Sequence, residues 1–161
     1  MEYPKRKRNR LKNYDYKNDG FYFITICVND RKEYFGNVKS EKVELNEYGK
    51  IIEKYLLILP EKFRVCSIDY YIIMPNHIHF ILVLDNSKTE MKFSVSDIVR
   101  FFKSVTTIEL HKEGIRNFKW QRSYYDRIIR NERELYLVRK YIEQNPFKWE
   151  LEKDNPENLD I

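Results

Sequence analysis

Glycine, cysteine and histidine are scarce in this chain, with 4, 2 and 3 copies among 161 residues. So few glycines leave no glycine-rich loop to cradle the phosphates of a nucleotide, and the sequence therefore predicts no nucleotide cofactor. Each of the two cysteines, Cys27 and Cys66, lies inside an apolar run. We expect reduced core thiols at both positions, because disulfides are rare in a reducing compartment.

Long apolar segments are also missing. No run reaches the roughly 20 residues that cross a bilayer, and no apolar stretch of a secretion signal follows the basic N-terminus MEYPKRKRNRLKNY. We therefore expect a cytoplasmic protein without membrane contact. Hydrophobic residues make up 42% and charged residues 34% of the sequence, which is typical of a folded globular chain. Its length predicts a single domain over 1–161, with a basic arm (1–15), a core (16–149) and an acidic tail (150–161).

The chain has fewer acidic than basic residues, and many of the basic residues lie near its N-terminus. The net charge is +5 and the isoelectric point is about 9.0, which favours a polyanionic partner such as a nucleic acid. A charged terminus can also be merely solvated, so the arm alone leaves this question open. The cations of the arm are Lys5, Arg6, Lys7, Arg8, Arg10 and Lys12.

Hydrophobic periodicity predicts seven elements in the order β-α-β-β-α-β-α. Strands are expected at 20–29, 64–74, 77–84 and 120–129, and helices at 46–59, 96–112 and 131–145. Asn131 and Glu134 form a capping signal for the last helix, and Pro146 should end it at Asn145. The apolar side of the long helix is expected to comprise Ile98, Val99, Phe102, Val105 and Ile108. The first six elements follow the ferredoxin-like split βαβ plan, an α+β fold with an antiparallel sheet, to which a C-terminal helix is added.

Two histidines interrupt the apolar third strand. Alternation along a strand places His77 and His79 on one face with their Cα atoms roughly 6.5–7 Å apart, so that both imidazoles can reach one metal ion. Ile78 and Phe80 should face the opposite side. The remaining histidine, His111, lies near a helix end and is expected to be solvated, so a third ligand must bear oxygen. Two imidazoles and one oxygen suit Mg²⁺ or Mn²⁺ at least as well as Zn²⁺.

The last helix carries a tyrosine and an amide on one face. Tyr141 and Asn145 are four residues apart, which places them one turn apart on the same stripe. Together they can reach across to a metal ion on the sheet. The spacing is equally consistent with a core aromatic at Tyr141 and a C-terminal cap at Asn145, so it leaves both interpretations open.

Four segments in a fixed order carry a resemblance to a known family: NRLKNYDYKNDGFYFITICVNDRKEYFG, MPNHIHFI, IVRFFKSVTT and WQRSYYDRIIRNERELYLVRKYIEQNPFKW. Together they span most of residues 9–149. In these segments the chain resembles the HUH single-strand DNA endonucleases and, within them, the single-tyrosine IS200-like transposases. Its likeness is greatest to the REP-associated tyrosine transposases.

The resemblance implies a role for each residue of the expected site. His77 and His79 match the paired histidines of the family, which hold a metal ion. Tyr141 matches the nucleophilic tyrosine of the Tyr-Ile-x-x-Asn-Pro segment, and Asn145 matches the polar residue that completes the metal site. The implied activity is metal-dependent cleavage and rejoining of single-stranded DNA at or near a hairpin, through a 5′-phosphotyrosine, with Mg²⁺ or Mn²⁺ as the cofactor. A monomer is favoured over a homodimer, in a prokaryotic cytoplasm and associated with the nucleoid.

Several polar residues are expected to contact the DNA, although each can also be an ordinary solvated side chain. Those beyond the arm are placed around the expected site, where they can grip phosphates. Arg127 departs from the family, which often has histidine after the YYD sequence, so its role is left open. The expected DNA contacts are Arg6, Arg8, Arg10, Lys12, Lys103, Gln121, Arg122, Arg127 and Arg130.

Two other functions compete with this interpretation. A ferredoxin-like sheet can bind a nucleic-acid hairpin without catalysis, and the histidines would then belong to a hydrogen-bond network. A metal-dependent hydrolase of small phosphoesters is the other alternative, but the sequence has a basic arm and lacks a carboxylate-rich metal cluster. The intact set of His77, His79, Tyr141 and Asn145 favours the cleaving enzyme, because a binding module has no use for all four.

Overall fold

The strands β1 (Gly20–Cys27) and β5 (His77–Leu84) are continuous runs of aromatic and aliphatic residues that pair at the centre of a sheet. Such residues suit a strand that is covered on both faces. The strand β4 (Cys66–Met74) lies beyond β5, and β6 (Tyr125–Ile129) lies beyond β1. All neighbours in this β4-β5-β1-β6 sheet are antiparallel. The computed structural model describes residues 14–151 of the chain.

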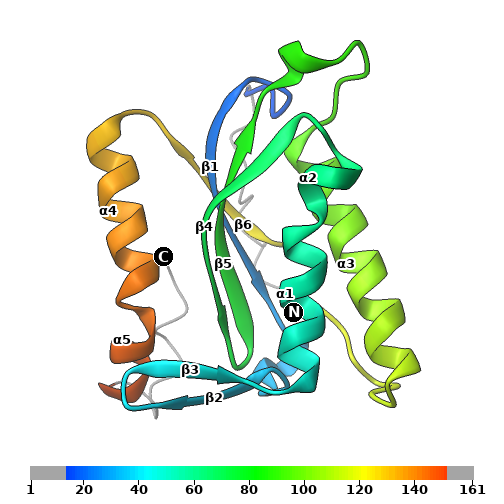
Figure 1. Ribbon diagram of the computed structural model, residues 1–161, viewed down its shortest axis with the longest axis vertical. Helices are drawn as coiled ribbons and strands as arrows, with labels where there is room; N and C mark the ends of the chain where they lie inside the picture. Colours follow the sequence, from blue (N-terminus) through cyan, green and yellow to red (C-terminus); the bar gives the residue numbers. More distant parts are fainter. Residues whose placement is uncertain (1–13, 152–161) are drawn as a thin grey trace, which may run out of the picture.

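Helices cover both faces of the sheet, as Figure 1 shows. The helices α1 (Glu47–Leu57) and α3 (Val95–Lys112) lie on one face, and α4 (Glu132–Glu143) lies on the other. The short elements are η1 (Asn29–Arg31), α2 (Leu59–Lys62), η2 (Asn86–Lys88) and α5 (Asn145–Leu151). The arrangement β1-α1-β4-β5-α3-β6 confirms the ferredoxin-like plan with an added C-terminal helix.

Each face of the sheet has its own apolar core. The larger core lies between the sheet and α1 and α3, and it contains Ile24, Ile78, Phe80 and Phe102. The smaller core lies under α4 and is built from Phe23, Ile81, Ile129, Val138 and Ile142. Both cysteines are buried, and within residues 14–151 no disulfide joins them. Strand alternation therefore sends neighbouring residues of β1 and β5 into two different environments.

The sequence did not predict a second, two-stranded sheet. Strands β2 (Gly36–Lys39) and β3 (Lys42–Leu45) form a hairpin through a two-residue turn at Ser40 and Glu41. Both turn residues have positive φ angles, of 51° and 61°, a conformation that normally selects Asn or Gly. The Glu41 N–H donates to a carboxylate oxygen of Glu150 at 2.9 Å, so part of this turn is stabilised by α5.

Two predicted elements differ in detail from the structure. The fourth strand begins at Tyr125 rather than at residue 120, because Trp120 forms only an isolated bridge to Val28 and packs into the larger core. Its indole N–H donates to Thr106 Oγ1 on α3 at 3.0 Å, which buries that polar residue. Ile108, expected on the apolar side of α3, is 52% exposed instead.

A helix that crosses a membrane must be both long and apolar. Over residues 14–151, no helix is both long enough and apolar enough to span a bilayer.

Candidate active site

His77 is fixed by the tight turn that precedes β5. The Asn76 side chain donates from Nδ2 to the Arg31 carbonyl at 3.1 Å, which turns its Oδ1 towards His77. This oxygen is 2.7 Å from His77 Nδ1. Because Oδ1 can only accept, Nδ1 carries the proton and Nε2 carries the lone pair. Nε2 is buried and has no hydrogen-bond partner in the described part of the chain.

His79 is held in a similar way by the neighbouring strand. Thr25 of β1 pairs with His79 in the sheet register, and its Oγ1 lies 2.7 Å from His79 Nδ1. Thr25 is fully buried, so its hydroxyl has to find its partner inside the protein. The two imidazole rings are 4.7 Å apart between centroids, which confirms that the histidines share one face of β5. Hydrogen bonds of this kind at one ring nitrogen orient the other nitrogen towards a metal ion.

Burial keeps both imidazoles neutral. It lowers the pKa of His77 to about 3, although the neighbouring Asn145 side chain partly opposes this effect. Burial also lowers the pKa of His79 well below its usual value, and the neighbouring His77 acts in the same direction. A neutral imidazole is the form that ligates metals.

Tyr141 lies on the inner side of α4, directly over this pair. Its ring centroid is 5.5 Å from that of His79 and 5.9 Å from that of Phe23. The Lys148 ammonium lies 4.7 Å from the centre of the tyrosine ring. The predicted approach of α4 to the histidine face is thus seen in the structure.

Asn145 reaches the site in a way that the sequence did not predict. The helix α4 ends at Glu143, before the expected position, and α5 begins at Asn145 with Pro146 in its first turn. Proline is tolerated there because the first helical N–H groups have no partner within the helix. Asn145 is 7% exposed, and its Nδ2 donates to the Tyr141 carbonyl at 3.4 Å. The break lets the chain continue over His77, where the ring centroid of Trp149 lies 6.0 Å away.

An ion pair ties α4 to the sheet. Arg139 donates from Nε and Nη2 to the two carboxylate oxygens of Asp69 at 2.7 and 2.6 Å. Asp69 lies at an irregularity in the pairing of β4 with β5, between Ile68 and Tyr71. A bulge of this kind redirects side chains, and here the carboxylate meets α4. The pair therefore helps to position the helix that carries Tyr141.

The donor set suits a divalent metal ion. His77 and His79 offer neutral imidazoles, His77 has a buried nitrogen without a hydrogen-bond partner, and Asn145 adds an amide. No cluster of three or more His, Cys, Asp or Glu side chains occurs within residues 14–151. Buried imidazole without a polar partner is costly, and a metal ion would satisfy it.

The expected DNA contacts divide between the two sides of the sheet. Arg127 pairs with Phe23 in the register of β6 and β1, and it lies on the Tyr141 side. Arg130 follows β6, and its N–H donates to Glu134 at 2.8 Å. The Glu134 carboxylate therefore accepts from the N–H of Arg130 and not from the N–H of the cap residue, Asn131. The Asn131 side chain accepts from the Glu134 N–H, as predicted for a helix cap. Residues Arg6, Arg8, Arg10 and Lys12 lie outside the described residues.

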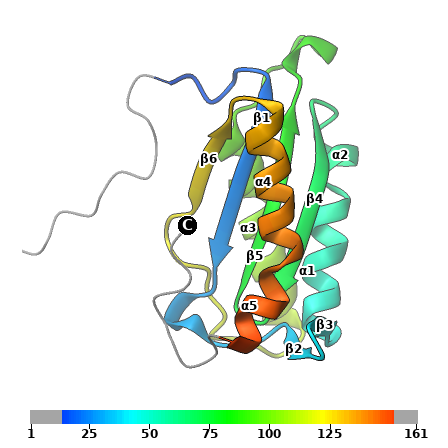
Figure 2. The same cartoon turned by 90° about the vertical axis from the view of Figure 1, so that its left-hand side faces the viewer.

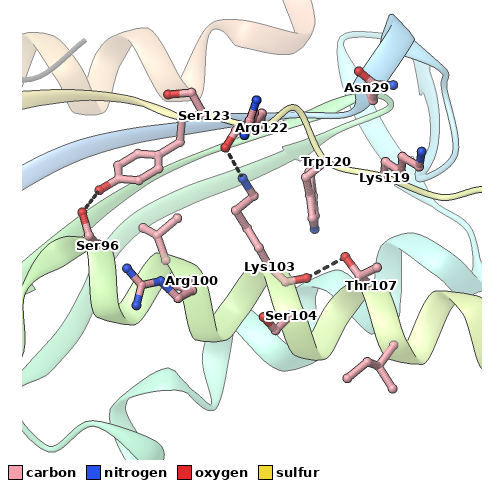
Figure 3. A pocket seen from close by; sticks show the side chains of 13 residues that line it. Asn29, Ser96, Arg100, Lys103, Ser104, Thr107, Lys119, Trp120, Arg122 and Ser123 are labelled. Atoms are coloured by element: carbon pink, nitrogen blue, oxygen red, sulfur yellow. Dashed lines mark hydrogen bonds between the residues drawn. The ribbon is translucent and has the colours of Figure 1, made fainter. Parts of the chain in front are cut away.

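Lys103 and Arg122 do not flank Tyr141. Lys103 belongs to α3, on the opposite face of the sheet, and its Nζ donates to the carbonyls of Gln121 and Arg122 at 2.8 and 3.3 Å. Figure 3 shows this contact across a groove between α3 and the segment that leads into β6. The prediction that these cations surround one site is therefore wrong: they form two groups, one on each side of the sheet.

The groove behind the sheet has a volume of about 870 Å³ and a basic lining. Its charged residues are Arg100, Lys103, Lys119 and Arg122, and no acidic residue lines it. Hydroxyl groups add hydrogen-bonding capacity, and one of them, Ser96 Oγ, lies 2.9 Å from the Tyr124 hydroxyl (Figure 3). Such a lining suits the phosphates of a nucleic acid.

Sequence reasoning missed Thr25, Asn76 and Trp149. Thr25 is the only small polar residue in the run FYFITICV, and such a residue in a buried strand indicates a specific partner. Asn76 directly precedes the histidines, but the pair Pro75-Asn76 is typical of a tight link between two strands and does not by itself indicate a site. No comparable signal marked Trp149, because its position depends on the path of α5.

The chain is similar in sequence to several known proteins. The family described as IS200-like transposases matches residues 17–145. An uncharacterized protein of Haemophilus influenzae is 33% identical over 90% of this chain and 90% of its own length. A second protein of that organism, provisionally named a REP-associated tyrosine transposase, is 28% identical over 83% of this chain and 74% of its own length.

Solved structures share the fold. A REP-associated tyrosine transposase bound to a REP hairpin superposes with a TM-score of 0.63 and 23% identity, covering 86% of this chain and 73% of the other. A protein of Deinococcus radiodurans, provisionally described as a transposase, gives a TM-score of 0.54 and 15% identity, covering 84% of this chain and 96% of the other.

Proposed function

Because this chain belongs to the family of IS200-like transposases, we propose that it cleaves and rejoins single-stranded DNA at or near a hairpin, through a covalent bond to Tyr141. The observation that carries the proposal is the convergence of Tyr141 with two neutral, oriented imidazoles on one face of the sheet. Asn145 lies beside them from the start of α5. A tyrosine and a site for a divalent cation are the parts that phosphodiester exchange requires.

His77, His79 and Asn145 would hold a divalent ion, Mg²⁺ or Mn²⁺, whose charge polarises the scissile phosphate and stabilises the leaving 3′-oxygen. The Tyr141 hydroxyl attacks phosphorus and loses its proton, and the bond from phosphorus to the 3′-oxygen breaks. The products are a 5′-phosphotyrosine and a strand that ends in a 3′-hydroxyl. One phosphoester replaces another, so the reverse attack by a 3′-hydroxyl rejoins DNA without a nucleotide cofactor.

The two basic surfaces give the DNA two kinds of contact. Arg127 lies on the Tyr141 side and would engage the single strand together with Arg130, whereas Lys103 and Arg122 line the groove behind the sheet, where a hairpin stem would bind. Gln121 would contact the DNA beside Lys103, which donates to its carbonyl. The basic arm, with Arg6, Arg8, Arg10 and Lys12, would add phosphate contacts to the stem. We propose a monomer that acts at the nucleoid.

A labelled hairpin with a single-stranded extension tests the reaction. With Mg²⁺ or Mn²⁺, a label at the 3′ end should migrate with the protein in SDS, because that fragment carries the phosphate bound to Tyr141. A label at the 5′ end should be released on a shorter fragment with a 3′-hydroxyl. The opposite distribution of labels would mean a 3′-phosphotyrosine and a different attack geometry.

A non-catalytic hairpin-binding module is the second candidate, because the hydrogen bonds of His77 and His79 also suit a structural network. Tight hairpin binding without any SDS-stable adduct, in either metal, would support this candidate. Hydrolysis of a small phosphoester at a comparable rate would instead support a phosphoesterase.

A further inference from the structure

A small cavity lies beside Tyr141, between α4 and the strands β1 and β6. Its volume is about 150 Å³. Figure 2 looks onto the α4 side of the sheet, where β6 lies beside the helix rather than behind it. Leu137 on its rim is 52% exposed and Arg127 is exposed, so a ligand can enter from solvent. The lining residues are Phe23, Arg127, Glu134, Leu137, Val138 and Tyr141.

The size and the walls of this cavity suit one aromatic ring. A cavity of about 150 Å³ with apolar walls is large enough to bind benzene. Phe23, Leu137 and Val138 give this cavity apolar walls, and the Tyr141 ring adds an aromatic one. A pyrimidine is a single six-membered ring, whereas the fused rings of a purine need more room. The volume therefore favours a pyrimidine base.

Two charged side chains can read the edge of such a base. Glu134 Oε2 accepts from the Arg130 N–H, which leaves Oε1 as a second acceptor on the same carboxylate. Arg127 takes part in neither of the ion pairs found within residues 14–151, so its guanidinium is not committed to an acidic side chain there. A pyrimidine edge carries a carbonyl at position 2, which an arginine can bind. At position 4, cytosine presents an amino group, which a carboxylate accepts.

We propose that this cavity binds a base of the single strand next to the scissile phosphate and selects cytosine. Arg127 binds the carbonyl at position 2, which cytosine and thymine share, and Glu134 accepts from the amino group that thymine lacks. The proposal rests on the proposed function, since it takes the strand at Tyr141 to be DNA. It makes Glu134 a specificity-determining residue, because a thymine oxygen facing its carboxylate would be repelled.

Binding of tailed hairpins tests the proposal without depending on cleavage. We would measure the affinity of the protein for one hairpin with a dC, dT or dA tail, in the absence of divalent metal. The dC tail should bind about tenfold more tightly than the dT tail, the effect of one hydrogen bond to a charged acceptor. The dA tail should be weaker than both.

The variant Glu134→Gln gives the sharpest result. Its amide oxygen still accepts from the Arg130 N–H, so the start of α4 is retained, but its NH₂ group donates to the thymine oxygen at position 4. The preference should therefore reverse in favour of the dT tail. Glu132→Gln is the matched control, because Glu132 lies in the same first turn and does not line the cavity. It should keep the preference for dC.

Filling the cavity gives a second, independent variant. Leu137→Trp adds volume at a half-exposed position, so the fold should survive while the base is excluded. All tails should then bind with equal affinity. Equal binding of dC and dT tails by the native protein, or an unchanged ratio in Glu134→Gln, would overturn the proposal. The two tests are independent. The covalent-adduct assay tests the proposed function whatever the tail preference is, and the ratio of dC to dT affinities can be measured even if no adduct forms.

Discussion

The two faces of the four-stranded sheet use the same strands for different purposes. The face towards α1 and α3 buries a large apolar core around Ile24, Phe80 and Phe102, with Thr106 as a buried polar residue on α3. The face towards α4 has a small apolar cluster and also buries Thr25 and both paired histidines. Buried polar groups add less to stability than apolar ones of the same size. The comparison indicates that the face towards α1 and α3 stabilises the fold. This stability allows the face towards α4 to hold polar groups in place.

Removing one oxygen atom from the α4 face should have the largest effect on activity. Tyr141→Phe should abolish the covalent adduct, because only the hydroxyl can attack the phosphate. The ring contacts with Phe23 and His79 are kept, so we expect the thermal midpoint to change by less than about 2 °C. Tyr136→Phe, at a 62% exposed position on the same helix, is the control. An adduct that persists in Tyr141→Phe would point to another tyrosine, of which Tyr125 is the next candidate.

Truncating either paired histidine should come next. His77→Ala or His79→Ala should weaken metal binding at least about 100-fold, because two remaining ligands compete poorly with water. Asn145→Ala should weaken it less, with partial recovery of cleavage in Mn²⁺. Calorimetric titration with Mn²⁺ measures these affinities, and His111→Ala controls for loss of an imidazole elsewhere. Unchanged metal affinity in the His77 or His79 variant would refute the metal site.

A deletion on the opposite face should affect stability instead. Phe102 is fully buried, so Phe102→Ala should lower the free energy of unfolding by about 3–5 kcal/mol. The rate of adduct formation per folded molecule should not change. Ile108→Ala, on the same helix at a 52% exposed position, should cost less than about 0.5 kcal/mol. Urea unfolding measures both, and a loss of cleavage in folded Phe102→Ala protein would show that the two faces are coupled.

The ion pair that ties α4 to the sheet should have a smaller effect. The Arg139 side chain is 43% exposed, so Asp69→Asn should cost about 1 kcal/mol of stability. Because α4 carries Tyr141, adduct formation should slow by more than the loss of folded protein explains. A double-mutant cycle with Arg139→Gln measures the coupling. Additive losses of stability in that cycle would mean that the pair contributes no net interaction.

The smallest effect should be a pH dependence at the start of α3. The Ser94 N–H donates to the Asp97 carboxylate at 2.8 Å and lowers the pKa of Asp97. A lowered pKa contributes stability above the ordinary value of about 3.9, and this contribution is lost as the pH falls through the lowered value. Asp97→Asn should therefore be less stable than the native protein near pH 6, by at most about 1 kcal/mol, and this difference should shrink as the pH falls towards 2.

Urea unfolding between pH 2 and pH 6 checks this prediction. Glu90→Gln, at an exposed position in the preceding loop, should show no such convergence. A difference between Asp97→Asn and the native protein that grows as the pH falls would contradict the assigned direction of the pKa.

Local sequence patterns were sufficient for the fold and for the histidine pair. Alternation in β5 places His77 and His79 on one face whatever surrounds them. Helical spacing predicted Tyr141 and Asn145 on one helix, whereas α4 ends at Glu143 and Asn145 begins α5. The β2–β3 hairpin was not predictable in this way. Its turn residues Ser40 and Glu41 lack the usual preference for positive φ, and α5 stabilises the turn from more than one hundred residues away.

Which side chains share a face of each element follows from the amino-acid order alone, because it depends only on the period of a strand or a helix. Which elements face each other depends on the folded arrangement. It placed Thr25 against His79 through the register of β1 and β5, brought Arg127 to the Tyr141 side, and put Lys103 behind the sheet. Register and helix docking depend on contacts between residues far apart in the chain, and no local period encodes them.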